Sequence, residues 1–115
     1  MYEQRIKTVR RNRGLEQMLV CDPRSIHYLT GAFIEPGERF LGLIVGSDAR
    51  PTLVLNALFA APADAACTVR SFTDTDDPLA IVEGLCDADK PLGCDKNLPA
   101  RFLLPLMERG AASGF

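Results

Sequence analysis

The sequence has a single histidine, His27, and its four cysteines include no CxxC pair. Closely spaced cysteine and histidine ligands are what a zinc site requires, so metal binding by this chain alone is not expected. Cys21 and Cys67 lie in or beside apolar strands, where a free cysteine behaves as a small hydrophobic residue. We therefore expect reduced structural thiols at all four positions, which are Cys21, Cys67, Cys86 and Cys94.

Sequence motifs of hydrolases and phosphate-binding proteins are also missing. The chain contains no GxSxG nucleophile elbow, no HExxH zinc motif and no glycine-rich phosphate loop. Ser25 and His27 are two positions apart on a predicted helix and so point to different faces. No catalytic constellation is predicted, and the chain by itself is expected to be inactive.

Long apolar runs and an excess of basic residues are absent as well. The apolar stretches are far shorter than the roughly 20 residues that span a bilayer, and no charged segment leads into an apolar one with a cleavage site. A net charge of −2 and a pI near 5.3 do not fit a nucleic-acid binder. We expect a cytoplasmic protein that binds neither nucleic acid nor membrane.

What the sequence does contain is enough for one α/β domain, residues 1–115. Of the 115 residues, 47% are hydrophobic, which is sufficient for a core of its own. Asp22-Pro23 and Asp77-Pro78 combine a helix N-cap with proline in the first turn. Helices are predicted over 2–13, 23–30, 78–86 and 99–109. Strands are predicted over 15–20, 40–45, 52–55, 68–72 and 91–94.

Connections between these elements define the topology. The turn-rich segment 46–51 predicts a hairpin, so at least one strand pair is antiparallel. Asn56 is predicted to cap a short helix that Pro62 interrupts. Residues 111–115 resemble the approach to one more strand, which suggests a domain cut from a longer protein. The fold class is a mixed β-sheet flanked by helices.

Several side chains receive a structural interpretation. We predict that Tyr28 and Leu29 are core contacts of their helix and that His27 is a surface or capping imidazole. Acidic clusters at 74–77 and 87–89 flank helix ends, where capping and solubility explain them better than metal ligation.

The segment Ile34–Arg39 has two possible interpretations. It places Glu35, Glu38 and Arg39 around Pro36. It could be a solvated turn with a local Glu–Arg pair, which contributes little when exposed. It could also be a binding loop, because proline stiffens the backbone and keeps the charges at defined positions. The residues alone leave both open.

Several short stretches along nearly the whole chain form a recognisable pattern. They are the helix around Arg5, Gly14-Leu15, Met18–Val20, Asp22-Pro23, IHYLTG at 26–31, EPGER at 35–39, PTLV at 51–54 and LGCD at 92–95. Taken together, these stretches resemble the N-terminal domain of the creatinase/prolidase/aminopeptidase P family, the pita-bread metallopeptidases. The charged loop after YLTG is most similar to that of bacterial Xaa-Pro dipeptidases, although Gly37 and Ala32-Phe33 depart from the usual family pattern.

The resemblance implies a mixed sheet with a ribonuclease H-like motif and a separate catalytic domain. That C-terminal domain would hold two divalent metal ions, manganese or cobalt, that activate water for hydrolysis of the bond next to proline. This chain would hold no cofactor and no catalytic residue.

The resemblance also implies homodimer formation and a loop that reaches the partner's active site. Arg39 would bind the carboxylate of a proline-containing dipeptide or peptide, and Glu35 or Glu38 its ammonium group. The alternatives are a protein-binding module of a metal-free relative, or the N-terminal domain of an aminopeptidase P or creatinase.

Overall fold

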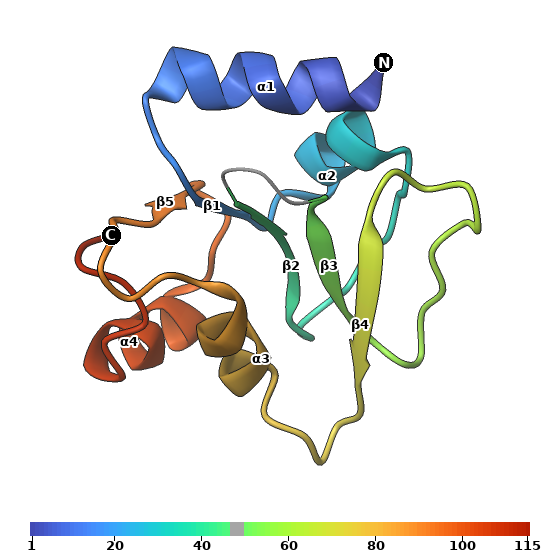
Figure 1. Ribbon diagram of the computed structural model, residues 1–115. Helices are drawn as coiled ribbons and strands as arrows, with labels where there is room; N and C mark the ends of the chain where they lie inside the picture. The colour runs from blue at the N-terminus through green and yellow to red at the C-terminus, as the bar shows by residue number, and fades with distance from the viewer. Residues whose placement is uncertain (47–49) are drawn as a thin grey trace.

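Helices and strands follow one another in the order α1-β1-α2-β2-β3-β4-α3-β5-α4 (Figure 1). The computed structural model describes residues 1–46 and 50–115, so part of the predicted turn 46–51 lies outside the described residues. The elements are α1 Tyr2–Arg13, β1 Met18–Val20, α2 Pro23–Thr30, β2 Leu41–Val45, β3 Thr52–Asn56, β4 Thr68–Phe72, α3 Pro78–Leu85, β5 Gly93–Cys94 and α4 Ala100–Glu108.

The starts of α2 and α3 follow the predicted cap-plus-proline signals. Asp22 and Asp77 are the N-cap residues, and a proline occupies the first turn of each helix. The Leu79 N–H donates to Asp77 Oδ1 at 3.1 Å, which satisfies one of the backbone donors that a helix start leaves unpaired. At α2 the Asp22 side chain makes no such bond to the backbone and accepts instead from Ser25 Oγ at 2.8 Å.

Gly31, which ends α2, is required by its backbone and by its surroundings. Its φ of 85° lies in the left-handed region, which favours glycine. A Cβ atom at this position would lie 2.8 Å from Tyr2 Oη, too close for a normal contact. The missing side chain thus lets α1 pack against the end of α2.

The sheet is mixed, as predicted, with strand order β4-β3-β2-β1-β5. β2 is antiparallel to β1 and β3, which confirms the predicted hairpin, whereas β1 pairs with β5 and β3 with β4 in parallel. All strands except β2 therefore run the same way. Their carboxyl ends and the start of β2 meet at one edge of the sheet, here called the carboxyl edge.

Helices cover both faces of the sheet, with α1 and α2 on one side and α3 and α4 on the other (Figure 1). Alternate strand residues divide between two cores: Leu43 packs toward α1 and α2, and Ile44 toward α3 and α4. Because both faces of the sheet are buried, the sequence of β2 is a continuous apolar run. Among the described residues, no helix is long and apolar enough to cross a membrane.

The short helix predicted at Asn56 does not form. Asn56 is instead the last residue of β3, and its side chain is almost fully buried. Its Oδ1 accepts from the Leu58 N–H at 2.9 Å, and its Nδ2 donates to Asp74 Oδ1 at 2.8 Å. The side-chain amide of Asn56 therefore stabilises a turn and binds a carboxylate distant in sequence, and it does not cap a helix.

The segment after α4 forms no strand. Residues 111–115 bend back, and the Ser113 N–H donates to the Lys90 carbonyl at 3.0 Å. The Leu92 N–H donates to the Gly114 carbonyl at 2.9 Å. These two bonds place the end of the chain beside β5.

The prediction for Tyr28 is wrong, whereas that for Leu29 is confirmed. Leu29 is buried, but Tyr28 is 55% exposed. The Arg5 guanidinium lies 4.4 Å from the centre of the Tyr28 ring and donates to the Tyr28 carbonyl at 2.8 Å. Tyr28 therefore links α2 to α1 at the surface through a cation–π contact. His27 is exposed, as predicted, with its ring edge-on to Phe33.

Candidate functional site

The charged loop Ile34–Arg39 connects α2 to β2 and lies at the carboxyl edge. Ile34 and the following Phe40 are buried, so both ends of the loop are anchored in the core. Gly37 has a φ of 64°, and the Arg39 N–H donates to the Pro36 carbonyl at 3.2 Å. This hydrogen bond closes a tight turn that presents the loop's charges to solvent.

Arg39 makes a bidentate ion pair with Asp74, which follows β4. Arg39 Nε lies 3.2 Å from Asp74 Oδ1, and Nη2 lies 3.3 Å from Oδ2. The pair is exposed, with 43% and 61% of the two side chains accessible. The hydrogen bonds from Arg39, and then from Asn56, hold the pKa of the Asp74 carboxyl below its ordinary value. The local Glu–Arg pair considered for this loop is replaced by this long-range pair.

Asn56 connects this ion pair to the sheet. Its buried amide donates to the same Asp74 oxygen that accepts from Arg39 Nε. A chain of contacts therefore runs from the end of β3, through Asp74, to the guanidinium of Arg39. Sequence reasoning did not identify Asn56 or Asp74 as partners of the loop.

The two glutamates of the loop, unlike Arg39, have no side-chain partner among the described residues. Glu35 and Glu38 are exposed, and within the described part of the chain their carboxylates make no hydrogen bond or ion pair. The backbone beside them is fixed, because Arg101 Nη2 donates to the Glu38 carbonyl at 2.6 Å. The guanidinium of Arg101 also lies 4.7 Å from the centre of the Phe102 ring. The loop is thus attached to α4 while its acids stay unpaired.

The acidic residues do not gather into a metal centre. Among residues 1–46 and 50–115, no group of three histidine, cysteine, aspartate or glutamate side chains could hold an ion. Asp76 accepts from the N–H and hydroxyl of Thr73, and Asp77 caps α3 and pairs with Arg109 at 2.8 Å. The family resemblance implies two metal ions in a separate domain, not at these residues.

The thiols lie in surroundings that raise their pKa values. Cys21 and Cys67 are buried, and all four cysteines are free. Burial, followed by the negative charge of Asp95, raises the pKa of Cys94 to about 11, and burial raises that of Cys86 to about 11. Little thiolate is present at neutral pH, so none of these thiols is placed as a nucleophile.

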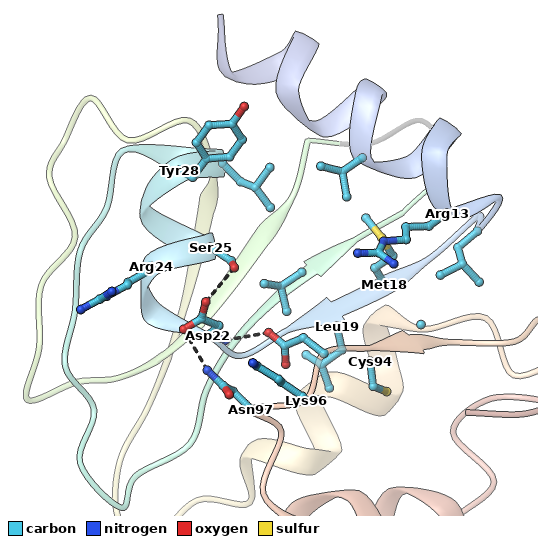
Figure 2. Close-up of a pocket in the computed structure, with 16 residues that line it drawn as sticks. Arg13, Met18, Leu19, Asp22, Arg24, Ser25, Tyr28, Cys94, Lys96 and Asn97 are labelled. Atoms are coloured by element: carbon cyan, nitrogen blue, oxygen red, sulfur yellow. Dashed lines mark hydrogen bonds between the residues drawn. The ribbon is translucent and has the colours of Figure 1, made fainter.

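A cleft of about 780 Å³ lies between α1, α2 and the parallel strands β1 and β5 (Figure 2). Its apolar floor belongs mainly to the α1–α2 side of the core, and its polar end lies at the carboxyl edge. The lining residues are Val9, Arg13, Leu15, Met18, Leu19, Val20, Asp22, Arg24, Ser25, Tyr28, Leu29, Gly93, Cys94, Asp95, Lys96 and Asn97.

Comparison with known proteins shows similarity over nearly the whole chain. Residues 4–114 match the family described as Creatinase/Prolidase N-terminal domain. A proline dipeptidase from Streptococcus pneumoniae is 25% identical, with a TM-score of 0.79 over 96% of this chain and 85% of that one. The Creatinase/Prolidase N-terminal domain of an X-Pro dipeptidase from Streptococcus pyogenes is 25% identical, with a TM-score of 0.77 over 99% and 95%.

One similar structure is much longer than this chain. The dipeptidase PepE from Mycobacterium ulcerans is 25% identical and has a TM-score of 0.76. The match covers 96% of this chain but 33% of that one. No curated protein sequence matches this chain.

Proposed function

This chain belongs to the creatinase/prolidase N-terminal domain family, and from that membership we propose that it is the non-catalytic domain of a cytoplasmic Xaa-Pro dipeptidase-like enzyme. In that enzyme it forms a homodimer and shapes the entrance to the partner's active site. The similarity to a proline dipeptidase and to an X-Pro dipeptidase domain supports this assignment.

The observation that carries the proposal is the ordered charged loop. A dipeptide has a free carboxylate and a free ammonium group, which require a cation and an anion at fixed positions. Asp74 orients the guanidinium of Arg39, while the carboxylates of Glu35 and Glu38 remain unpaired. Arg39 would bind the substrate carboxylate, and one of the glutamates its ammonium group.

The hydrolytic chemistry lies outside this chain. In the proposed enzyme a C-terminal domain would hold two divalent metal ions, manganese or cobalt, and these would supply an activated water for hydrolysis. The present residues bind and orient the substrate, and Pro36 limits the conformational entropy that the loop loses on binding.

Substitution of Arg39 in the full-length protein tests the loop's role. Arg39→Ala should lower kcat/KM for Xaa-Pro dipeptides by about tenfold to a few hundredfold, the effect of losing one charge-assisted contact. The thermal midpoint should change little, because the Arg39–Asp74 pair is exposed. An unchanged kcat/KM would show that Arg39 does not bind the substrate. A large loss of stability would indicate a structural role for Arg39 instead.

Mixed dimers test whether the loop acts on the partner subunit. Arg39→Ala subunits are combined with subunits that lack one metal ligand. In the heterodimer, the site with intact metals faces an intact loop only if the loop acts across the interface. Activity above that of either homodimer supports the proposal. Heterodimers that form but recover no activity contradict it. A separate observation tests the alternative function: if the full-length protein lacks the metal ligands, it is the protein-binding relative instead.

A further inference from the structure

The outer edge of β4 is an open strand edge. β4 is the first strand in the order β4-β3-β2-β1-β5, so only its edge toward β3 is paired (Figure 1). The four consecutive residues from Thr68 to Ser71 are exposed, whereas every residue of the central strand β2 is buried. Such an edge presents backbone groups to which another extended chain can bond.

The alternation of the backbone identifies the free groups of this edge. The Thr68 N–H and the Phe72 carbonyl bond to residues that flank or end β3, at 2.9 and 2.8 Å, so the even-numbered residues of β4 bond toward β3. Successive residues of a strand direct their N–H and C=O groups to opposite sides. Val69 and Ser71 therefore direct theirs away from the sheet, and within the described part of the chain these four groups have no hydrogen-bond partner.

Side chains close the two ends of the same edge. Arg50 Nη2 donates to the Cys67 carbonyl at 3.0 Å, and the Thr73 N–H donates to Asp76 Oδ2 at 2.8 Å. One of these bonds lies before the open stretch, residues 69–71, and the other lies after it. The open stretch is therefore bounded at both ends, and its four free backbone groups are the ones that a further strand would bond.

The two faces of the open stretch present different side chains. Val69 is 41% exposed and pairs with Leu53, which belongs to the core on the α1–α2 side. Arg70 pairs with Val54, which belongs to the core on the α3–α4 side. Among the described residues, the exposed Arg70 side chain makes no hydrogen bond or ion pair. A strand added here therefore meets an apolar side chain on one face and an uncompensated positive charge on the other.

A second copy of this chain does not fit the open stretch well. Two identical strands related by a two-fold axis pair in antiparallel fashion, and the register that uses all four free groups places Val69 opposite Ser71 of the second copy. Arg70 then lies directly opposite Arg70 of the second copy, where like charges destabilise the pair. Arg70 thus disfavours self-pairing and favours a strand that carries an acidic residue at the central position.

We propose that the outer edge of β4 binds an extended segment of a partner protein, with an acidic residue at its centre and an apolar residue on either side. The segment adds as an antiparallel strand, the more stable pairing per residue, and bonds the backbone groups of Val69 and Ser71. Its acid pairs with Arg70, and one apolar neighbour packs against Val69. This surface is separate from the charged loop and does not depend on the function proposed for it.

Peptide titration followed by NMR tests this surface on the 115-residue chain. The probe is the acetylated and amidated peptide TTVEVTT, which should give saturable amide shifts at Val69, Arg70 and Ser71. At saturation, hydrogen exchange of the Val69 and Ser71 amides should slow about tenfold or more, because the peptide bonds them. The Arg70 amide, which already bonds toward β3, should change much less. No saturable shifts at millimolar peptide, or shifts confined to another surface, would overturn the proposal.

Matched peptides separate the backbone contacts from the charge. N-methylation of both valines of TTVEVTT removes two donors, so this peptide should bind about tenfold more weakly or worse. TTVKVTT should bind about fivefold more weakly than TTVEVTT, because an exposed ion pair is replaced by a repulsion. Equal binding of the N-methylated peptide contradicts the proposal. That comparison uses the unaltered chain and so stands whether or not a variant folds.

A charge reversal assigns the acidic preference to Arg70. Arg70→Glu should bind TTVKVTT more tightly than TTVEVTT, the opposite of the wild type. Arg11→Glu reverses the charge of another exposed arginine, on α1, and should keep the wild-type preference. A preference that both variants keep contradicts the proposal. Sedimentation of the chain without peptide checks the second copy: a dimer whose Val69 and Ser71 amides are protected would assign the edge to self-association and overturn the proposal.

Discussion

The guanidinium of Arg39 and the carboxylate of Asp74 lie side by side although 35 positions separate them in the sequence. The contact joins the loop before β2 to the loop after β4. Those two loops are neighbours because the parallel strands β3 and β4 end where the antiparallel strand β2 begins. The strand directions, rather than local sequence, therefore place the loop's cation against its partner.

The first prediction concerns acid stability. The folded state keeps the pKa of Asp74 below its ordinary value, so folding favours the ionised carboxyl. Its contribution should be complete above about pH 4, the unfolded value, and should be lost as the pH falls through the lower folded value. Urea denaturation of the wild type and Asp74→Asn should show a small difference at pH 7 that closes in acid. A difference independent of pH would contradict the assignment.

The second prediction compares two glycines with similar backbone. Gly31 and Gly37 both have positive φ, but a Cβ on Gly31 would meet Tyr2 Oη, whereas a Cβ on Gly37 meets nothing within 4 Å. Gly37→Ala should lower the free energy of unfolding by about 1 kcal/mol through backbone strain alone. Gly31→Ala should lower it by roughly 2–3 kcal/mol because of the added clash.

Chemical denaturation measures both effects, and Tyr2 provides the control. Tyr2→Phe removes the hydroxyl that a new Cβ would meet, so it should recover part of the loss caused by Gly31→Ala and none of that caused by Gly37→Ala. Equal losses for the two glycine variants would show that the Tyr2 contact is unimportant.

The third prediction concerns the cysteines. Titration of the denatured chain without reductant should find four free thiols. In the folded chain at pH 7, alkylation should be slow, because the pKa of Cys86 and that of Cys94 are about 11 and thiolate is the reactive form. The rate should increase about tenfold per pH unit up to pH 9. A protected pair of thiols, identified by mass spectrometry, would contradict this prediction.

Local chemistry made much of the fold predictable. The pairs Asp22-Pro23 and Asp77-Pro78 mark helix starts through contacts within a few residues, and both helices begin there. Continuous apolar runs similarly located β2 and β3. These signals depend on neighbours in sequence, so they can be read without knowing the tertiary structure.

The errors arise where distant segments decide a side chain's partner. Asparagine is a common helix N-cap residue, but the Asn56 side-chain amide donates a hydrogen bond to Asp74 instead. Tyr28 has an apolar ring at a helical position, yet Arg5 of α1 covers it at the surface. The partner of Arg39 could not be predicted for the same reason. Predicting these three contacts requires knowledge of the strand order and of the packing of α1 on α2.

The last prediction combines Asp74 with the proposed role of Arg39 in the full-length enzyme. If Asp74 orients the guanidinium for a substrate carboxylate, Asp74→Asn should lower kcat/KM for Xaa-Pro dipeptides, but by less than Arg39→Ala does. The double variant should be no worse than Arg39→Ala alone, because Asp74 acts through a group that is already absent. Steady-state kinetics of the two single variants and the double variant form the cycle that measures this coupling.

Asp76→Asn supplies the matched control for that cycle. Asp76 lies two residues from Asp74, carries the same charge, and makes its hydrogen bonds to Thr73 rather than to Arg39. It should therefore leave kcat/KM within about twofold of the wild type, since a general change in charge at this edge has little effect. Equal losses in Asp74→Asn and Asp76→Asn would attribute the effect to net charge. Additive losses in the double variant would show that Asp74 and Arg39 act independently, and the positioning role of Asp74 would then be wrong.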